Sequence, residues 1–289
     1  MTLRSSIARH TAAAAIAVLV LLPQGASAAA TRCPQHFPGG MAPDLANPRL
    51  GARVQELCYV GFAVLHSGIT RTPLWSAEHL TPGRLRAARR TERDSEFHAD
   101  SNLAPEDRAE LSDYRRSGFD RGHLAPSGDM PDSDAQQESF SLANIIPQNR
   151  ALNRGIWEGI ESAVRDYVGS KGEVYVVTGP VFRGQTLRRI NGRVLVPTDI
   201  YKAVYDPRRR QAGAYLVVNA EVSVFQEVSI ARLREISGID VFPGLPAAVR
   251  DQALDLPDPK VRGRQRRSDT EGQEGHGAPF AIAGDDPAT

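Results

Sequence analysis

The 289-residue chain has only two cysteines and almost no excess charge, and its apolar run at 12–22 is too short to span a bilayer comfortably. It contains no internal repeat, no glycine-rich phosphate loop and no His-Glu-x-x-His motif. These absences argue against a repeat protein, a P-loop nucleotide-binding protein and a zinc protease of that type. The formal net charge of +1 excludes a uniformly basic surface. A strongly acidic partner would therefore have to meet positive charge that is concentrated locally.

The N-terminus has the features of an export signal. Arg4 and Arg9 precede the apolar run, and Ala26-Ser27-Ala28 is a small-x-small cleavage site. We therefore expect 1–30 to be a signal peptide, with an uncleaved anchor as the alternative. After cleavage, 33 basic and 34 acidic residues remain. We expect the mature protein to be periplasmic or secreted and to make no contact with a membrane.

The mature chain is long enough for one α+β domain, expected at 31–255, and the polar stretch 256–289 is typical of a disordered tail. Cys33 and Cys58 both lie in the domain. An exported protein meets an oxidising compartment, so we expect these cysteines to form a disulfide, with two free thiols as the alternative. Without a matching group of histidines they are poor evidence for zinc.

Periodicity and turn residues predict the elements of the domain. The expected strands are 57–65, 73–75 at a sheet edge, 144–148, 174–178 ending at Gly179-Pro180, 194–196, 201–205 and 214–218. The expected helices are 105–114, a helix or turn at 136–142, 152–167 with Gly169 as its C-cap, and 229–237 with Gly238 as its end. Pro207 and the arginines that follow it predict a hairpin turn.

The segment from Gly118 to Pro126 carries the first chemical signal, because Asp120, Arg121 and His123 lie within four residues. An imidazole can remove a proton from water near neutral pH, and a guanidinium can bind phosphate oxygens with two parallel hydrogen bonds. The combination suggests phosphodiester hydrolysis. The alternative is a structural histidine in a loop, and we expect the segment to be a loop.

Arginines gather in two places, which are candidate patches for nucleic acid. For the first group, a merely solvated surface is the alternative. The groups are Arg84, Arg86, Arg89, Arg90 and Arg93, and then Arg115, Arg116 and Arg121.

The predicted helix at 152–167 carries the second chemical signal. Asn153, Trp157, Glu161 and Arg165 recur at intervals of four and form a slowly drifting stripe beside the apolar one. An amide oxygen is a suitable ligand for Mg²⁺, which keeps several waters, and Glu161 could hold one of those waters. Arg165 could pair with Glu161. The alternative is a solvated helix face.

Together, the two signals give the chain a family resemblance. Asp120-Arg-Gly-His123, Asn144, Pro147-Gln148, Asn153, Trp157 and Glu161 resemble the DNA/RNA non-specific endonuclease family, whose members include secreted bacterial sugar-non-specific nucleases and mitochondrial endonuclease G. The resemblance runs from about 58 to 246. It implies a ββα-metal nuclease fold with a central antiparallel sheet flanked by helices.

The resemblance also implies a role for each matching residue. His123 matches the general base, Arg121 the clamp on the scissile phosphate and Asn153 the direct metal ligand. Glu161 matches the acid that orients metal-bound waters. Substrate contacts are expected from Asn144, Gln148, Arg165 and an upstream arginine, which is Arg93 with Arg90 as the alternative. Asp120 is expected to orient the motif.

These assignments predict an exported endonuclease that uses Mg²⁺, with Mn²⁺ as the alternative ion, and acts on DNA and RNA. Water activated by His123 attacks phosphorus, which leaves 5′-phosphate and 3′-hydroxyl ends. The rival interpretations are a nucleic-acid-binding module without catalysis and a hydrolase with Ser127 as nucleophile. Ser127 lacks the G-x-S-x-G context. The sequence leaves the oligomeric state open, a homodimer included.

Overall fold

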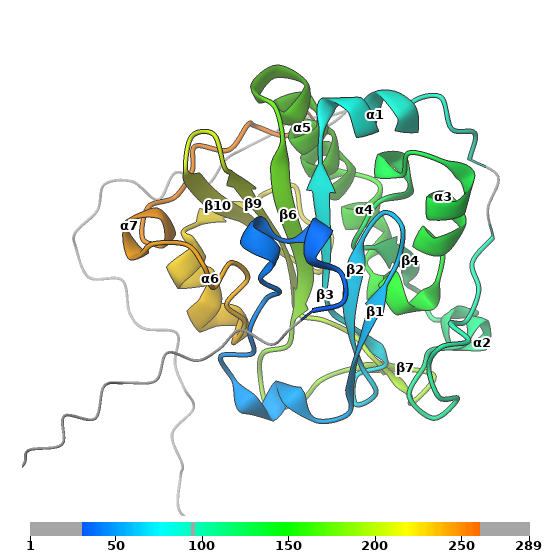
Figure 1. Ribbon diagram of the computed structural model, residues 1–289. Coiled ribbons are helices and arrows are strands. Elements are labelled where there is room, and N and C mark those ends of the chain that lie inside the picture. Colours follow the sequence, from blue (N-terminus) through cyan, green and yellow to red (C-terminus); the bar gives the residue numbers. More distant parts are fainter. Residues whose placement is uncertain (1–30, 94–95, 261–289) are drawn as a thin grey trace, which may run out of the picture.

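The computed structural model describes residues 31–93 and 96–260. Its main element is a seven-stranded sheet in the order β1-β2-β3-β6-β9-β10-β11, with every neighbouring pair antiparallel (Figure 1). The predicted α+β class with a central antiparallel sheet is therefore confirmed. The strands are β1 Val54–Cys58, β2 Ala63–Ser67, β3 Thr72–Leu80, β6 Val174–Val181, β9 Asp199–Asp206, β10 Gln211–Val218 and β11 Gln226–Val228.

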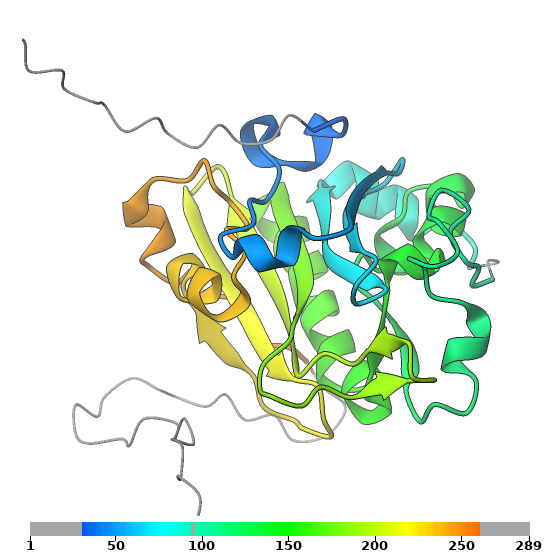
Figure 2. The same cartoon turned by 90° about the horizontal axis from the view of Figure 1, so that it is seen from below.

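Helices cover both faces of this sheet because apolar side chains alternate along its strands. Val176 and Ile200 face the layer of α5 (Ile156–Lys171). Their chain neighbours Val177 and Tyr201 face the layer of α6 (Ile230–Ser237). Viewed from below, the strands run between these two helices (Figure 2). The other α-helices are short: α1 Pro82–Ala88, α2 Leu111–Tyr114, α3 Ser133–Ser139, α4 Arg150–Asn153 and α7 Ala247–Arg250.

The first strands differ from the prediction. The run 57–65 is not one strand but the hairpin of β1 and β2, because the chain turns between Tyr59 and Phe62, where the Tyr59 N–H donates to the Phe62 carbonyl. The expected edge strand 73–75 is the nine-residue β3, which lies third in the sheet. Pro73 is tolerated there because the β2–β3 register shifts beside it, between Leu65 and His66.

Two predicted helices also differ. Only Leu111–Tyr114 of the expected helix 105–114 is helical. The expected helix 152–167 is two helices, since α4 ends at Asn153 and α5 begins at Ile156. Gly155 makes the break: a Cβ there would lie 2.7 Å from the Ala151 carbonyl oxygen. At its other end α5 passes the expected cap Gly169 and stops at Gly172, whose φ of 109° favours glycine.

β6 continues through Gly179-Pro180 to Val181, although we expected it to end there. Its pairing with β3 stops at Thr178, so the missing N–H of Pro180 leaves no gap in that ladder. Other predictions are confirmed. β9, β10, α6 with Gly238 at its end and the turn at 207–210 lie at the predicted places, as do β5 Ile145–Gln148 and β8 Val194–Leu195. β8 pairs antiparallel with β7 (Arg189–Ile190), and α3 overlaps the helix or turn expected at 136–142 but begins three residues before it.

The two ends of the described chain are tied to the sheet. Cys33 is bonded to Cys58 at the end of β1, as predicted. At the other end, Leu256 is buried and the Tyr215 hydroxyl donates to the Pro257 carbonyl. The packed chain thus continues past the predicted boundary at 255, because Leu256 fills the α5 layer. The predicted signal peptide and the remainder of the predicted tail, 261–289, lie outside the described residues.

Within 31–93 and 96–260, no helix combines the length and the apolar character that crossing a membrane requires.

Candidate active site

The Asp120-Arg-Gly-His123 motif is a strand rather than the expected loop. It forms β4 (Asp120–His123), which pairs antiparallel with β5 (Ile145–Gln148), the strand predicted at 144–148. Gly122 permits this pairing, because a Cβ there would lie 2.0 Å from the Gln148 side-chain oxygen. After β5 the chain continues into α4 and then α5. The motif residues are therefore joined to Asn153 on α4 and to Glu161 on α5 in a strand-strand-helix unit.

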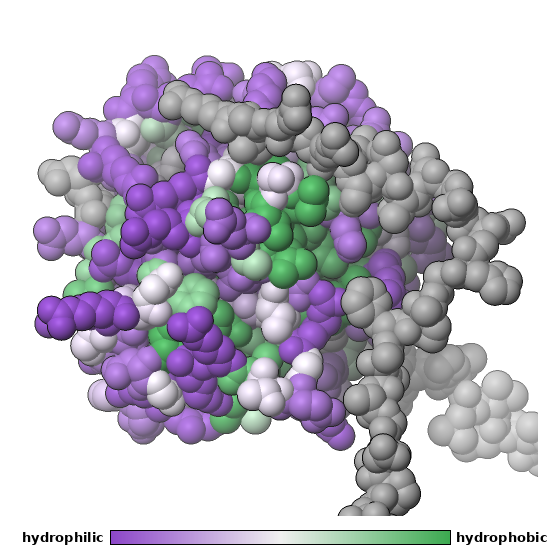
Figure 3. All heavy atoms as spheres, turned by 180° about the vertical axis from the view of Figure 1, so that it is seen from behind, coloured by the Kyte–Doolittle hydropathy of each residue, from purple (hydrophilic) through white to green (hydrophobic). Residues whose placement is uncertain are grey.

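A cleft of about 920 Å³ lies over this unit. Six arginines and three carboxylates line it, so it concentrates the positive charge that the near-neutral chain as a whole lacks. From behind, the side of the molecule that carries β4 and α3–α5 is mainly hydrophilic (left in Figure 3). The charged residues that line the cleft are Arg93, Arg115, Asp120, Arg121, Arg150, Arg154, Glu158, Glu161 and Arg165.

His123 lies at the cleft between two aromatic rings. Its ring centroid is 5.2 Å from that of Phe97 and 4.9 Å from that of Phe140. The same rings carry guanidinium groups: Arg121 lies 4.3 Å from the Phe97 centroid and Arg93 5.3 Å from the Phe140 centroid. Burial first, and then the charges of Arg93 and Arg121, lower the pKa of His123 to about 3. Its imidazole is therefore uncharged near pH 7, the protonation state that a general base requires.

The Nε2 atom of His123 is buried and has no hydrogen-bond partner within the described part of the chain. A buried polar atom without a partner is rare and often marks a functional site.

Asn153 is held by the first residue of the motif. Its side-chain nitrogen donates to Asp120 at 3.2 Å, and Asp120 also accepts from Arg150 and Arg154. Partial burial opposes ionisation of Asp120, but hydrogen bonds from Arg154 and Asn153 outweigh it and lower the pKa of the carboxyl. Asp120 thus has the position of an orienting residue, and the amide oxygen of Asn153 is left for another partner.

Glu161 follows Asn153 along the cleft on α5. Burial raises the pKa of its carboxyl to about 7, against the charges of Lys202 and Arg165. Arg165 forms its ion pair with Asp129, at 3.1 Å, and among the described contacts it makes none with Glu161. The predicted pair of Arg165 and Glu161 is therefore wrong, because η4 (Ser127–Asp129) brings a closer carboxylate to the guanidinium.

A sequence profile described as DNA/RNA non-specific endonuclease matches residues 43–248. The chain belongs to this endonuclease family. Among its relatives, mitochondrial nuclease EXOG of Danio rerio is 34% identical over 220 residues, which cover 68% of this chain and 63% of that protein. Nuclease C1 of Cunninghamella echinulata var. echinulata is 31% identical over 204 residues, 64% of this chain and 81% of that protein. The chain thus spans less than two thirds of the EXOG relative.

A solved structure of the EndoG/EndoGI complex is similar to this chain, with a TM-score of 0.62 and 26% identity over 68% of this chain and 88% of that chain. The ββα-metal nuclease fold that the resemblance implied is therefore confirmed. The relatives named above are nucleases.

Not every residue that the endonuclease resemblance placed at the site lies in the cleft. Asn144 is fully buried, and its amide bonds Ser76 and the backbone of Ala125 and Ser139. Gln148 is fully buried against Gly122. The predicted substrate contacts of Asn144 and Gln148 do not fit these positions. Asn144 instead anchors the segment that follows His123.

Of the two candidate upstream arginines, Arg93 has the position that fits the expected role. Among the described residues Arg93 lines the cleft, and Arg90 does not. Arg84, expected in the surface patch, is a largely buried residue whose guanidinium pairs with Glu78 at 3.2 Å and donates to the Asp129 carbonyl. The first patch is therefore smaller than predicted.

Sequence reasoning missed four residues of the cleft region. Arg150 and Arg154 flank Asn153 and are more than 60% exposed. Their spacing of four around the expected metal ligand was the signal that could have found them. Phe97 and Phe140 carry no such signal, since an aromatic side chain beside a polar motif usually belongs to the core.

The residues present fit a divalent ion of the kind that this metal-nuclease family uses. Within the described ranges, no three His, Cys, Asp or Glu side chains form a cluster. Mg²⁺ does not require such a cluster, because it keeps several waters and binds few protein oxygens. The Asn153 oxygen, left free by the bond to Asp120, would bind the ion directly, and Glu161 would hold its waters.

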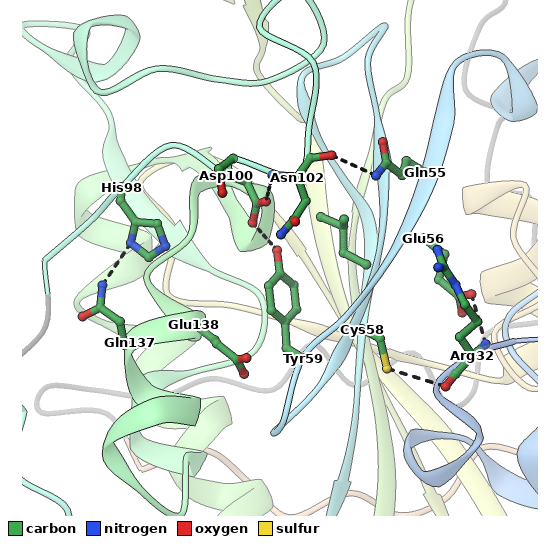
Figure 4. A pocket seen from close by; sticks show the side chains of 12 residues that line it. Arg32, Gln55, Glu56, Cys58, Tyr59, His98, Asp100, Asn102, Gln137 and Glu138 are labelled. Atoms are coloured by element: carbon green, nitrogen blue, oxygen red, sulfur yellow. Dashed lines mark hydrogen bonds between the residues drawn. The ribbon is translucent and has the colours of Figure 1, made fainter.

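A second hollow, of about 540 Å³, lies beside β1 and contains none of the predicted catalytic residues (Figure 4). Its polar groups bind one another. The Tyr59 hydroxyl donates to Asp100, and His98 bonds Gln137. The hollow therefore has a structural explanation and is not a second centre.

Proposed function

We propose that this protein is an exported, metal-dependent endonuclease that hydrolyses DNA and RNA with little sequence specificity. Its family supports nucleic-acid hydrolysis. One observation carries the finer proposal: the neutral imidazole of His123, with a free buried Nε2, shares a cleft with Arg121 and the oriented amide of Asn153.

The reaction uses water as the nucleophile. The imidazole of His123 takes a proton from a water molecule, whose oxygen attacks phosphorus while the bond to the 3′ oxygen breaks, and the departing 3′ oxygen takes up a proton from solvent water. Arg121 and Arg93, already held on aromatic rings, bind the phosphate oxygens. A divalent ion held by Asn153, Mg²⁺ or alternatively Mn²⁺, supplies positive charge to the phosphate and the leaving oxygen when bound. The products are 5′-phosphate and 3′-hydroxyl ends.

The arginines of the cleft suit phosphates rather than base edges. A phosphate backbone is common to all sequences, so contacts to it give affinity without sequence preference. Attack by water does not need a 2′-hydroxyl, so both DNA and RNA are substrates. The bond between Cys33 and Cys58 suits an oxidising compartment and supports a periplasmic or secreted location.

A cleavage assay tests the proposal. Purified protein is incubated with plasmid DNA and with RNA, in Mg²⁺, in Mn²⁺ and in EDTA, and the product ends are labelled. We expect cleavage of both substrates in either metal, none in EDTA, and 5′-phosphate ends. Binding of both nucleic acids without cleavage in any metal would favour the binding-module interpretation instead.

A further inference from the structure

Lys202 on β9 is a buried cation that the proposed reaction does not use. Its side chain is 1% exposed. It is one of only three lysines in a chain with 35 basic residues. Burial of an ammonium group is unfavourable unless acceptors surround it. The acceptors around Lys202 therefore indicate its structural role.

The ammonium group of Lys202 contacts the segment after β4, a strand of the main sheet and α5. It donates to the Thr178 hydroxyl at 2.7 Å and to the Leu124 carbonyl at 3.4 Å. The ring of Trp157 lies 5.7 Å from it. A compact group with three donors fits this position, whereas the planar guanidinium used almost everywhere else in this chain has a different geometry.

These contacts join the segment that carries His123 to the helix that carries Glu161. Leu124 directly follows His123, so the bond to its carbonyl fixes the backbone next to the imidazole. Trp157 lies on α5, one turn before Glu161. Thr178 belongs to β6, which pairs with β9. Lys202 therefore connects the end of β4 to the main sheet and to α5, the helix that carries Glu161.

The surrounding charges support this role. Arg84 pairs with Glu78 and Arg165 pairs with Asp129. Lys202 acts on Glu78 and Glu161, and its charge is the largest influence that opposes the effect of burial on the pKa of Glu161. With Arg84 and Arg165 engaged elsewhere, Lys202 is the cation that most favours a carboxylate at position 161.

We propose that Lys202 is a positioning residue of the cleavage centre. Its buried ammonium group holds the segment after His123 against α5, which sets the imidazole relative to Asn153 and Glu161. Lys202 lines no part of the cleft among the described residues, so it acts through its neighbours. The inference rests on the proposed function.

The test is Lys202→Met, which keeps an unbranched apolar side chain of similar length and removes the charge. Rates are normalised to the folded fraction. We expect kcat to fall about 10- to 100-fold with KM within about threefold of wild type, as for residues that orient a metal site. Calorimetric titration with Mg²⁺ alone, without nucleic acid, should show binding weakened about tenfold.

Tyr201→Phe is the matched control. Tyr201 precedes Lys202 on β9, is equally buried and faces the opposite layer, so its variant should keep the wild-type kcat and Mg²⁺ binding. Thr178→Val removes the nearest partner of Lys202 and should give a smaller loss in the same direction. The double variant should lose no more than Lys202→Met alone, because both changes break one contact.

A folded Lys202→Met with kcat and Mg²⁺ binding within threefold of wild type would overturn the inference while leaving the proposed function intact. If Lys202→Met does not fold, Thr178→Val decides: wild-type kcat and Mg²⁺ binding in that variant overturn the inference equally. A wild-type protein that cleaves neither DNA nor RNA overturns the proposed function, and the inference with it.

Discussion

The side-chain nitrogen of Asn153 donates a hydrogen bond to the carboxylate of Asp120, 3.2 Å away, across the junction of β4 and α4. The first residue of the motif thus controls the rotation of the amide proposed as metal ligand. His123 is thus linked to Asn153 through the backbone of β4 and the carboxylate of Asp120.

Asp120→Ala should release this amide. We expect the Mg²⁺ concentration for half-maximal activity to rise about tenfold, since partners of metal ligands typically contribute 10- to 100-fold to affinity or activity. A Mg²⁺ titration of activity in both proteins measures the change. Superimposable titration curves would show that the hydrogen bond is incidental.

His123→Ala should lower kcat by a factor of roughly 10² or more, because the proton acceptor is lost, while binding of nucleic acid changes little. His98→Ala is the control: this partly buried histidine borders the second hollow and not the cleft. Single-turnover rates and filter binding separate the two effects. Turnover of His123→Ala within a few-fold of wild type would remove His123 from the mechanism.

The requirement for Mg²⁺ should depend on pH through Glu161. Burial raises the pKa of this carboxyl to about 7, so it is ionised above pH 7 and takes up a proton below it. Protons then compete with the metal, and half-saturation should need more Mg²⁺ at pH 6 than at pH 8. His123, with its pKa lowered to about 3 by burial, adds no titration in this range.

Glu161→Gln is the control for this pH effect. The amide cannot ionise, so the variant should need more Mg²⁺ than wild type at pH 8 and should show a flatter dependence on pH. Equal half-saturation of the wild type at pH 6 and pH 8 would contradict the assignment.

Arg121→Ala should reduce cleavage of DNA and RNA alike, because both present the same phosphodiester. Binding of both nucleic acids should also weaken as the salt concentration rises. The slope of the logarithm of the binding constant against the logarithm of the salt concentration should be smaller by about one in the variant. Arg232→Ala is the control, since Arg232 is exposed on α6 and pairs with Glu235 away from the cleft. Loss of preference at a single base position would instead indicate base reading.

The disulfide should contribute to stability and not to catalysis. Its cysteines are 25 residues apart, and closure of a loop of that size stabilises a protein by about 3 kcal/mol. We expect Cys33→Ser/Cys58→Ser to lower the free energy of urea unfolding by about that amount, with kcat unchanged. Non-reducing mass spectrometry should find one linked peptide pair, and free thiols in protein isolated from the periplasm or medium would refute the bond in vivo.

The composition of this cleft could be predicted from the sequence where residue type decides it. An imidazole, a guanidinium and an amide at the observed spacings predict metal-assisted hydrolysis, and His123, Arg121 and Asn153 do meet in one cleft. At Asn144 and Gln148, residue type alone led to a wrong prediction of substrate contacts. An amide beside a reactive motif looks like a substrate contact, but both are buried and Asn144 satisfies backbone groups.

Contacts between distant segments explain the other errors. The motif was expected to be a loop because Pro126 and Gly128 follow it. Its partner strand β5 lies more than twenty residues later, and no local pattern encodes that pairing. Lys202 stands in a strand among apolar residues, where its sequence context shows no link to Leu124 or Thr178. The break before α5 depends on the backbone of Gly155, which periodicity does not report.

Phe97 and Phe140 hold the reactive groups before any substrate arrives. Arg121 and Arg93 rest on their faces, and His123 lies between them. Long side chains ordinarily lose rotamer entropy when they bind, which weakens affinity. Here much of that ordering takes place during folding. The proposed endonuclease would therefore meet each new phosphodiester with its site already arranged, as action at any position along the polymer requires.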